Sequence, residues 1–172
     1  MRIERHRIEQ TVDIAASAPS VWQEVTQVDL TSFRHPAYLK VLGIPKPLSA
    51  EVTRPGVGGA RVALFSNGHR FSQEITEWQP CERYAFRFAP DRGFRVAYCL
   101  DLSDGPFRIL SGAYDLRQTD ARTTLCLTSE YELRGALGAC LRRPVRAVLH
   151  LFQSYLLAGI RANSERRELP PA

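Results

Sequence analysis

Paired cysteines and clustered metal ligands are missing from this sequence. Its four cysteines, Cys81, Cys99, Cys126 and Cys140, are far apart and form no C-x-x-C pair. The four histidines are equally dispersed, whereas a structural zinc site draws its ligands from short spacings. We therefore expect no metal site, and we expect the cysteines to act as small buried apolar side chains.

Long apolar runs are also absent. No segment approaches the length that spans a bilayer. The basic start of the chain, residues 1–7, is not followed by the apolar region of a secretory signal. We expect a cytoplasmic protein without a transmembrane segment.

Lysine is scarce, since Lys40 and Lys46 are the only two, and arginine supplies nearly all of the positive charge. Residues 134–172 hold seven arginines and two glutamates, and that difference of five equals the net charge of +5 of the whole chain. A nucleic-acid binder usually interleaves basic and aromatic residues or carries a recognised motif. Neither is present, so we expect no nucleic-acid partner and interpret the arginines as a solvated helix face.

The composition that remains is that of an ordinary globular protein. The chain has 172 residues, of which 44% are hydrophobic and 24% charged. A chain of this length buries a substantial core. We expect a single domain over residues 1–168 and a short polar tail at residues 169–172.

Alternating apolar residues and turn signals predict a series of strands. The dipeptide Asn67-Gly68 between two of them is a strong hairpin signal. The segment at residues 90–105 is open to two interpretations, an extra strand or a lid over a pocket. The predicted strands are residues 5–15, 48–54, 60–66, 69–78, 82–89, 107–118 and 123–133.

Helical patterns occupy two places. A short amphipathic helix is expected from Ser17 onward and a second at residues 31–39. Beyond Gly135 a helix of roughly 20 residues, about 30 Å, is expected, with Pro144 at its start or at a kink. Its apolar stripe is Val145, Val148, Leu149, Phe152, Leu156 and Ile160, and Arg146, His150, Gln153 and Arg161 are expected on the other side.

This order of elements predicts the fold class. Consecutive strands joined by tight turns form an antiparallel meander, and the long helix is the one large apolar partner for its buried face. We expect an α+β helix-grip fold: a curved antiparallel sheet of about six to seven strands around the C-terminal helix, with two short helices after the first strand.

Four segments resemble the START-like or Bet v 1-like superfamily, and within it the polyketide cyclase/dehydrase-like branch. The resemblance covers about residues 5–167 and is weakest at residues 90–105. The segments are residues 12–22 (VDIAASAPSVW), residues 56–61, the motif Phe71-x-x-Glu74-x-x-Glu77-Trp78-x-Pro80-x-x-Arg83, and residues 131–138 (YELRGALG). The resemblance implies a hydrophobic-ligand cavity between sheet and helix, and it brings no universal catalytic motif.

Strand alternation and the helical stripe select the candidate ligand-binding residues. They could equally be core residues with no ligand between them. Catalytic residues are not identified. The candidates are Phe71, Gln73, Ile75, Tyr84, Phe86, Phe88, Tyr98, Tyr114, Phe152 and Leu156.

Two polar residues stand out among or beside these candidates. Gln73 shares the inward parity of its strand, and a buried amide needs a partner, which is either a ligand oxygen or an ordinary structural hydrogen bond. His35 is placed at the pocket mouth, where a histidine can act as an acid or base, although solvent exposure is the simpler interpretation.

Three functions fit the sequence. The first is binding of a small hydrophobic or amphipathic molecule, such as a lipid, polyketide or aromatic metabolite, without a cofactor. The second is an aromatase/cyclase-type enzyme, and the third is a stress-response or membrane-surface interaction module. A homodimer is left open.

Overall fold

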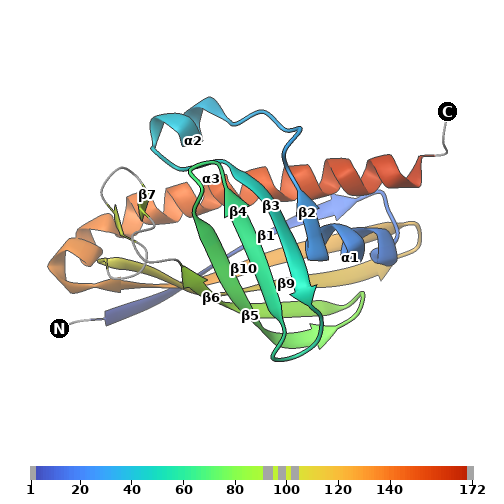
Figure 1. The fold of residues 1–172 in the computed structure, drawn as a ribbon, viewed down its shortest axis with the longest axis horizontal. Coiled ribbons are helices and arrows are strands. Elements are labelled where there is room, and N and C mark those ends of the chain that lie inside the picture. Colours follow the sequence, from blue (N-terminus) through green and yellow to red (C-terminus); the bar gives the residue numbers. More distant parts are fainter. Residues whose placement is uncertain (1–2, 91–94, 97–99, 102–104, 170–172) are drawn as a thin grey trace.

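The computed structural model describes residues 3–90, 95–96, 100–101 and 105–169. A long helix lies across a strongly curved sheet (Figure 1). The helices are α1 (Ala18–Thr26), α2 (Ala37–Val41) and α3 (Gly135–Glu168). The strands are β1 (Ile3–Ile14), β2 (Gln27–Asp29), β3 (Pro47–Arg54), β4 (Ala60–Phe65), β5 (Arg70–Gln79), β6 (Arg83–Pro90), β7 (Arg95–Val96), β8 (Leu100–Asp101), β9 (Phe107–Thr119) and β10 (Arg122–Arg134).

The main sheet is antiparallel, in the order β1-β10-β9-β6-β5-β4-β3-β2. The helix-grip fold expected from the sequence is therefore confirmed, with eight strands instead of six to seven. The additional strand is β2, which pairs with β3. Val28 lies on this strand and is buried in the core.

The segment at residues 90–105 contains a small separate pair of strands. Arg95 pairs with Asp101 and Val96 with Leu100, which joins β7 to β8 outside the main sheet. The remaining residues of this segment lie outside the described part of the chain. The structure thus places a hairpin-like pair here, and whether the segment acts as a lid stays an open prediction.

Helix α3 is longer than the sequence pattern predicted. It has 34 residues, about 51 Å, because it begins directly after β10 at Gly135 and not at Pro144. The turn between strand and helix uses a φ of +68° at Gly135, a conformation that a side chain would strain. Pro144 therefore sits inside the helix, at the cost of one backbone hydrogen bond.

The second short helix also differs from expectation. It covers Ala37–Val41, whereas residues 31–39 were expected. The helix begins directly after Pro36. Proline is favourable at a helix start, and it disfavours the helical conformation at the preceding residue, here His35. The helix buries Leu39 and leaves Val41 exposed.

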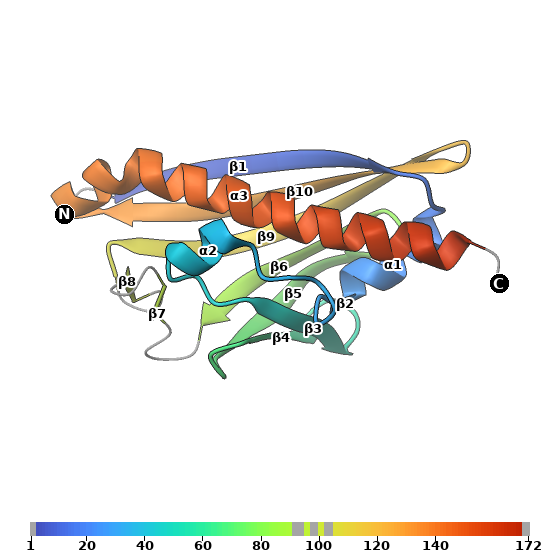
Figure 2. The same cartoon turned by 90° about the horizontal axis from the view of Figure 1, so that it is seen from above.

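Helix α3 does not pack evenly on the sheet. It packs along β1 and β10 and against α1. Figure 2 shows it running beside β1 and β10, with β3, β4 and β5 curving away below it. A helix that touches one side of a curved sheet leaves a space over the other strands, and the candidate site lies in that space.

Candidate functional site

A partly open cavity of about 320 Å³ lies between α3 and the concave face of the sheet. A volume of a few hundred Å³ is typical of small-molecule sites. The lining is mostly apolar. It comes from β2 to β6, β9, β10, the loop after α2, and α3: Val28, Leu30, Leu42, Ile44, Pro45, Pro47, Ser49, Ala50, Arg61, Ala63, Phe65, Phe71, Gln73, Phe86, Phe88, Phe107, Ile109, Tyr114, Leu127, Ser129, Leu141, Pro144, Val145, Val148, Leu149, Phe152, Gln153 and Leu156.

Seven of the ten candidate residues line this cavity. They are Phe71, Gln73, Phe86, Phe88, Tyr114, Phe152 and Leu156. Ile75 and Tyr84 are fully buried in the core and are not part of the lining. Tyr98 lies outside the described residues.

Tyr84 misses the cavity because α1 covers its end of the sheet. Its ring meets those of Trp22 and Trp78, with centroids 6.3 and 5.5 Å away. Burial raises the pKa of its phenol above the ordinary value, so the group stays neutral at physiological pH. Its hydroxyl has no partner in the described structure.

His35 does not line the cavity. The side chain is half-buried in the segment before α2, and its Nε2 atom has no hydrogen-bond partner within the described part of the chain. The role at a pocket mouth stays a prediction.

Arg61 is the polar cavity residue that the sequence analysis did not single out. It is 3% exposed. Its Nη1 donates to Oε1 of Gln73 at 2.9 Å and its Nη2 to the backbone carbonyl of Val25 at 3.2 Å. The guanidinium carbon lies 5.6 to 5.9 Å from the ring centroids of Tyr84, Phe86 and Tyr114.

Within the described part of the chain, the charge of Arg61 has no counter-ion. None of the ion pairs among the described residues includes it, and its Nε atom is buried without a partner. A buried cation is ordinarily paired, because removing it from water costs several kcal/mol, by an order-of-magnitude estimate. Strand alternation in the sequence could have identified Arg61, because it has the same parity as the buried Ala63 and Phe65 and therefore points to the same face.

Gln153 corrects the helix pattern drawn from the sequence. It was expected on the polar side of the helix but is 2% exposed and lines the cavity. Its Nε2 donates to Oγ of Ser129 on β10 at 2.9 Å. The curved sheet covers more than one side of α3, so a single apolar stripe underestimates what the helix buries.

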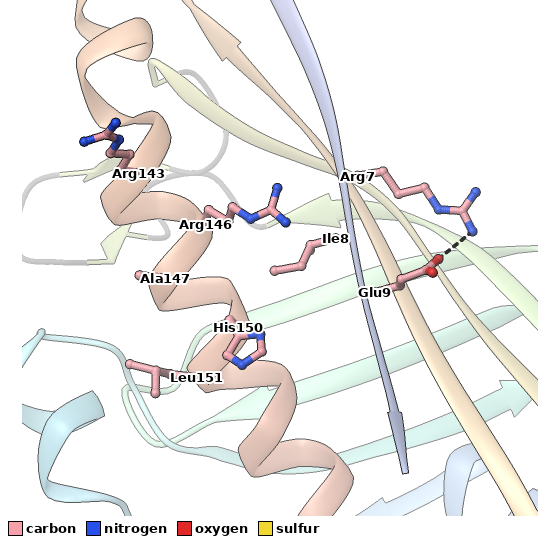
Figure 3. Close-up of a pocket in the computed structure, with 8 residues that line it drawn as sticks. All are labelled: Arg7, Ile8, Glu9, Arg143, Arg146, Ala147, His150 and Leu151. Atoms are coloured by element: carbon pink, nitrogen blue, oxygen red, sulfur yellow. Dashed lines mark hydrogen bonds and ion pairs between the residues drawn. The ribbon is translucent and has the colours of Figure 1, made fainter.

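A second hollow lies on the protein surface, between β1 and the N-terminal half of α3 (Figure 3). It measures about 890 Å³ but is open to solvent. Arg143, Arg146 and His150 contribute cationic or titratable groups from α3, and Arg7 pairs with Glu9 at 3.1 Å. A groove this open excludes little water from a ligand, so the smaller and less open cavity is the stronger candidate site.

Metal ligands are not gathered in the part of the chain that the structure describes: no group of three or more His, Cys, Asp or Glu side chains could hold an ion there. Of the described helices, none has the length and apolarity needed to cross a membrane.

The fold and cavity together define a class: an antiparallel sheet gripping one long helix over an apolar interior. Residues 5–165 match the family model described as polyketide cyclase / dehydrase and lipid transport. The chain belongs to this family, which confirms the resemblance noted in its sequence segments. No curated protein matches the sequence significantly.

Solved structures share the fold. The Zhui aromatase/cyclase of a Streptomyces species is 20% identical, with a TM-score of 0.62 over 95% of this chain and 96% of that chain. A protein of Thermus thermophilus has the same identity and TM-score, covering 95% of this chain and 100% of its own. Ara h 8.0201 is 14% identical, with a TM-score of 0.59 over 95% and 97% of the two chains. At these identities the similarity shows the fold alone.

Proposed function

We propose that this protein binds a small, largely apolar molecule carrying an oxygen acceptor, in the cavity between the sheet and α3. The observation that carries the proposal is the Arg61 guanidinium at the cavity wall, for which the described residues supply no carboxylate partner. Family membership supports the same conclusion, because the family description includes lipid transport.

The hydrogen-bonding capacity of this wall favours an acceptor. Arg61 has five N–H bonds, two of which are used by Gln73 and Val25. The oxygen of the Gln73 side chain is occupied by Arg61, which leaves the amide hydrogens of Gln73 as further donors. A carboxylate or phenolate at this wall would neutralise the charge of Arg61, and either of these groups or a polarised carbonyl would accept hydrogen bonds from the free donors.

A pair of probes that differ in one group tests the proposal. We expect 2-naphthoate to displace an apolar fluorescent dye from the full chain, and Arg61→Met to weaken its binding about tenfold to a hundredfold, because a charge-assisted hydrogen bond is lost. The control probe is 2-methylnaphthalene, whose affinity should change little. If no apolar probe occupies the cavity, the proposal is wrong.

A second candidate function is cyclisation of a reactive polyketide, favoured by donors that converge on one wall and could polarise a carbonyl. The cavity lining lacks carboxylate and imidazole groups among the described residues, so proton transfer would fall to Tyr114 or the substrate, because a guanidinium does not release its proton. Incubation with a linear poly-β-keto thioester should then yield a cyclised product with loss of water, detected by mass spectrometry. A product yield equal to that in buffer would exclude this candidate.

A further inference from the structure

The cavity has a second polar position, on the same face of the sheet as Arg61 but several strands away. Ser129 of β10 and Gln153 of α3 both line the cavity, and they are 7% and 2% exposed. Gln153 donates from Nε2 to Oγ of Ser129 at 2.9 Å, and its own oxygen accepts a hydrogen bond from Nε2 of Gln10 at 3.3 Å. Ser154 holds Gln10 in turn, by donating to its Oε1 at 2.8 Å.

This chain of hydrogen bonds leaves one donor unused. The Ser129 oxygen accepts from Gln153, so its own hydrogen must be donated elsewhere. Among the described residues Ser129 has no acceptor for that hydrogen, and its side chain borders the cavity. The hydroxyl is therefore available to an oxygen of a bound molecule.

The backbones of Arg61 and Ser129 are well separated across the sheet, and the Arg61 side chain spans part of that separation, since its guanidinium carbon lies 5.6 Å from the ring centroid of Phe86 on β6. Ser129 lies opposite Gly112 of β9, Gly112 opposite Phe86 of β6, and Phe86 opposite Ile75 of β5, the strand that also carries Gln73. Gln73 thus lies on the strand three spacings from Ser129, about 14 Å along the curved sheet, and the Arg61 backbone on β4 is one spacing further.

The sheet between the two positions presents the aromatic rings of Phe86 and Tyr114 to the cavity. The ring of Phe86 lies over Gly112, where an added Cβ would be 2.7 Å from a ring carbon. Glycine at this position lets the ring lie directly on the strand. An elongated, mostly apolar body can therefore rest on this ring between Arg61 and Ser129, with the ring of Tyr114 beside it.

We propose that the ligand is an elongated molecule with an oxygen acceptor at each end, one held by Arg61 and Gln73 and the other by the Ser129 hydroxyl. This inference rests on the proposed binding function and narrows its ligand class. The alternative is that the Ser129–Gln153 bond only fastens α3 to the sheet.

Two isosteric probes separate these alternatives. The probes are 6-acetyl-2-naphthoate, which has a carbonyl at its far end, and 6-isopropenyl-2-naphthoate, which has a CH₂ group in its place. We expect calorimetry on the full chain to show tighter binding of the acetyl probe by about threefold to tenfold, the range of one neutral hydrogen bond. Ser129→Ala should reduce this ratio to about one.

Ser49→Ala is the matched control, because Ser49 lines the cavity from β3, far from Ser129 in the strand order. It should leave the ratio unchanged. Equal binding of the two probes to the unmodified protein would overturn the inference, and so would a ratio that persists in Ser129→Ala. The comparison on the unmodified protein decides the matter even if Ser129→Ala does not fold.

The outcomes also distinguish this inference from the proposed function. If 2-naphthoate binds in an Arg61-dependent way while the two longer probes bind equally, the second position is wrong and the binding function stands. If none of the naphthoates binds, both proposals are overturned.

Discussion

At the scale of single residues, the buried charge of Arg61 is unfavourable for the stability of the fold. Arg61 places a cation among the rings of Tyr84, Phe86 and Tyr114, without a carboxylate beside it among the described residues. Cation–π contacts and two hydrogen bonds offset part of the desolvation cost. Strained or uncompensated groups cluster at functional sites, because selection there favours binding over stability.

The Arg61→Met substitution should therefore leave the free energy of unfolding unchanged or raise it by about 1–2 kcal/mol, since replacing buried charges by apolar groups of similar volume is often neutral or stabilising. Urea unfolding of both proteins without ligand measures the difference. A loss greater than about 1 kcal/mol, on the scale of a buried hydrogen bond, would show that Arg61 is chiefly structural.

At the scale of elements, the C-terminal end of α3 is joined to the start of α1. One carboxylate oxygen of Glu168 accepts hydrogen bonds from the hydroxyls of Ser17 and Ser20, both at 2.6 Å, and from the backbone N–H of Ser17 at 3.1 Å. Nearby, Arg167 pairs with the buried Glu24 at 2.6 Å. These contacts fix the helix that forms one wall of the cavity.

The hydrogen bonds from Ser17 and Ser20 lower the pKa of Glu168 to about 2. A lowered pKa means that the ionised form stabilises the fold fully above the ordinary value of 4.5 and less as the pH falls toward 2. We expect Glu168→Gln to lower the Tm by about 1–3 °C at pH 7 and to have a much smaller effect near pH 2. Thermal unfolding between pH 2 and 7 tests this.

Glu74 of β5 provides the control, because its side chain is exposed and outside this junction. Glu74→Gln should not change the Tm at either end of the pH range. An effect of Glu168→Gln that is independent of pH would contradict the role assigned to the carboxylate charge.

At the scale of the whole molecule, the cavity results from unequal packing. Helix α3 packs on β1, β10 and α1, and the sheet curves away from it over β4 to β6. A helix is straight over its length whereas a twisted sheet of eight strands is not, so the two surfaces cannot stay in contact everywhere. Side chains fill part of the gap, and about 320 Å³ is left.

The sequence by itself determined the fold and much of the cavity wall. Period-two alternation placed Phe71, Gln73, Phe86 and Phe88 on the inward face, because successive side chains of a strand point to opposite sides. The helical stripe placed Phe152 and Leu156 opposite them in the same way. These patterns are local, and they can be recognised in the sequence without knowing which surface the strand or helix packs against.

Only the tertiary structure decided which inward residues meet the cavity and what the polar ones do there. Ile75 and Gln73 share one strand face, but Ile75 is packed in the core and Gln73 reaches the cavity beside Arg61. The burial of Gln153 on Ser129 depends on how the sheet wraps the helix. Contacts between residues far apart in the sequence set the distance between helix and sheet and the pairing of the polar groups. A local sequence pattern contains no information about such contacts.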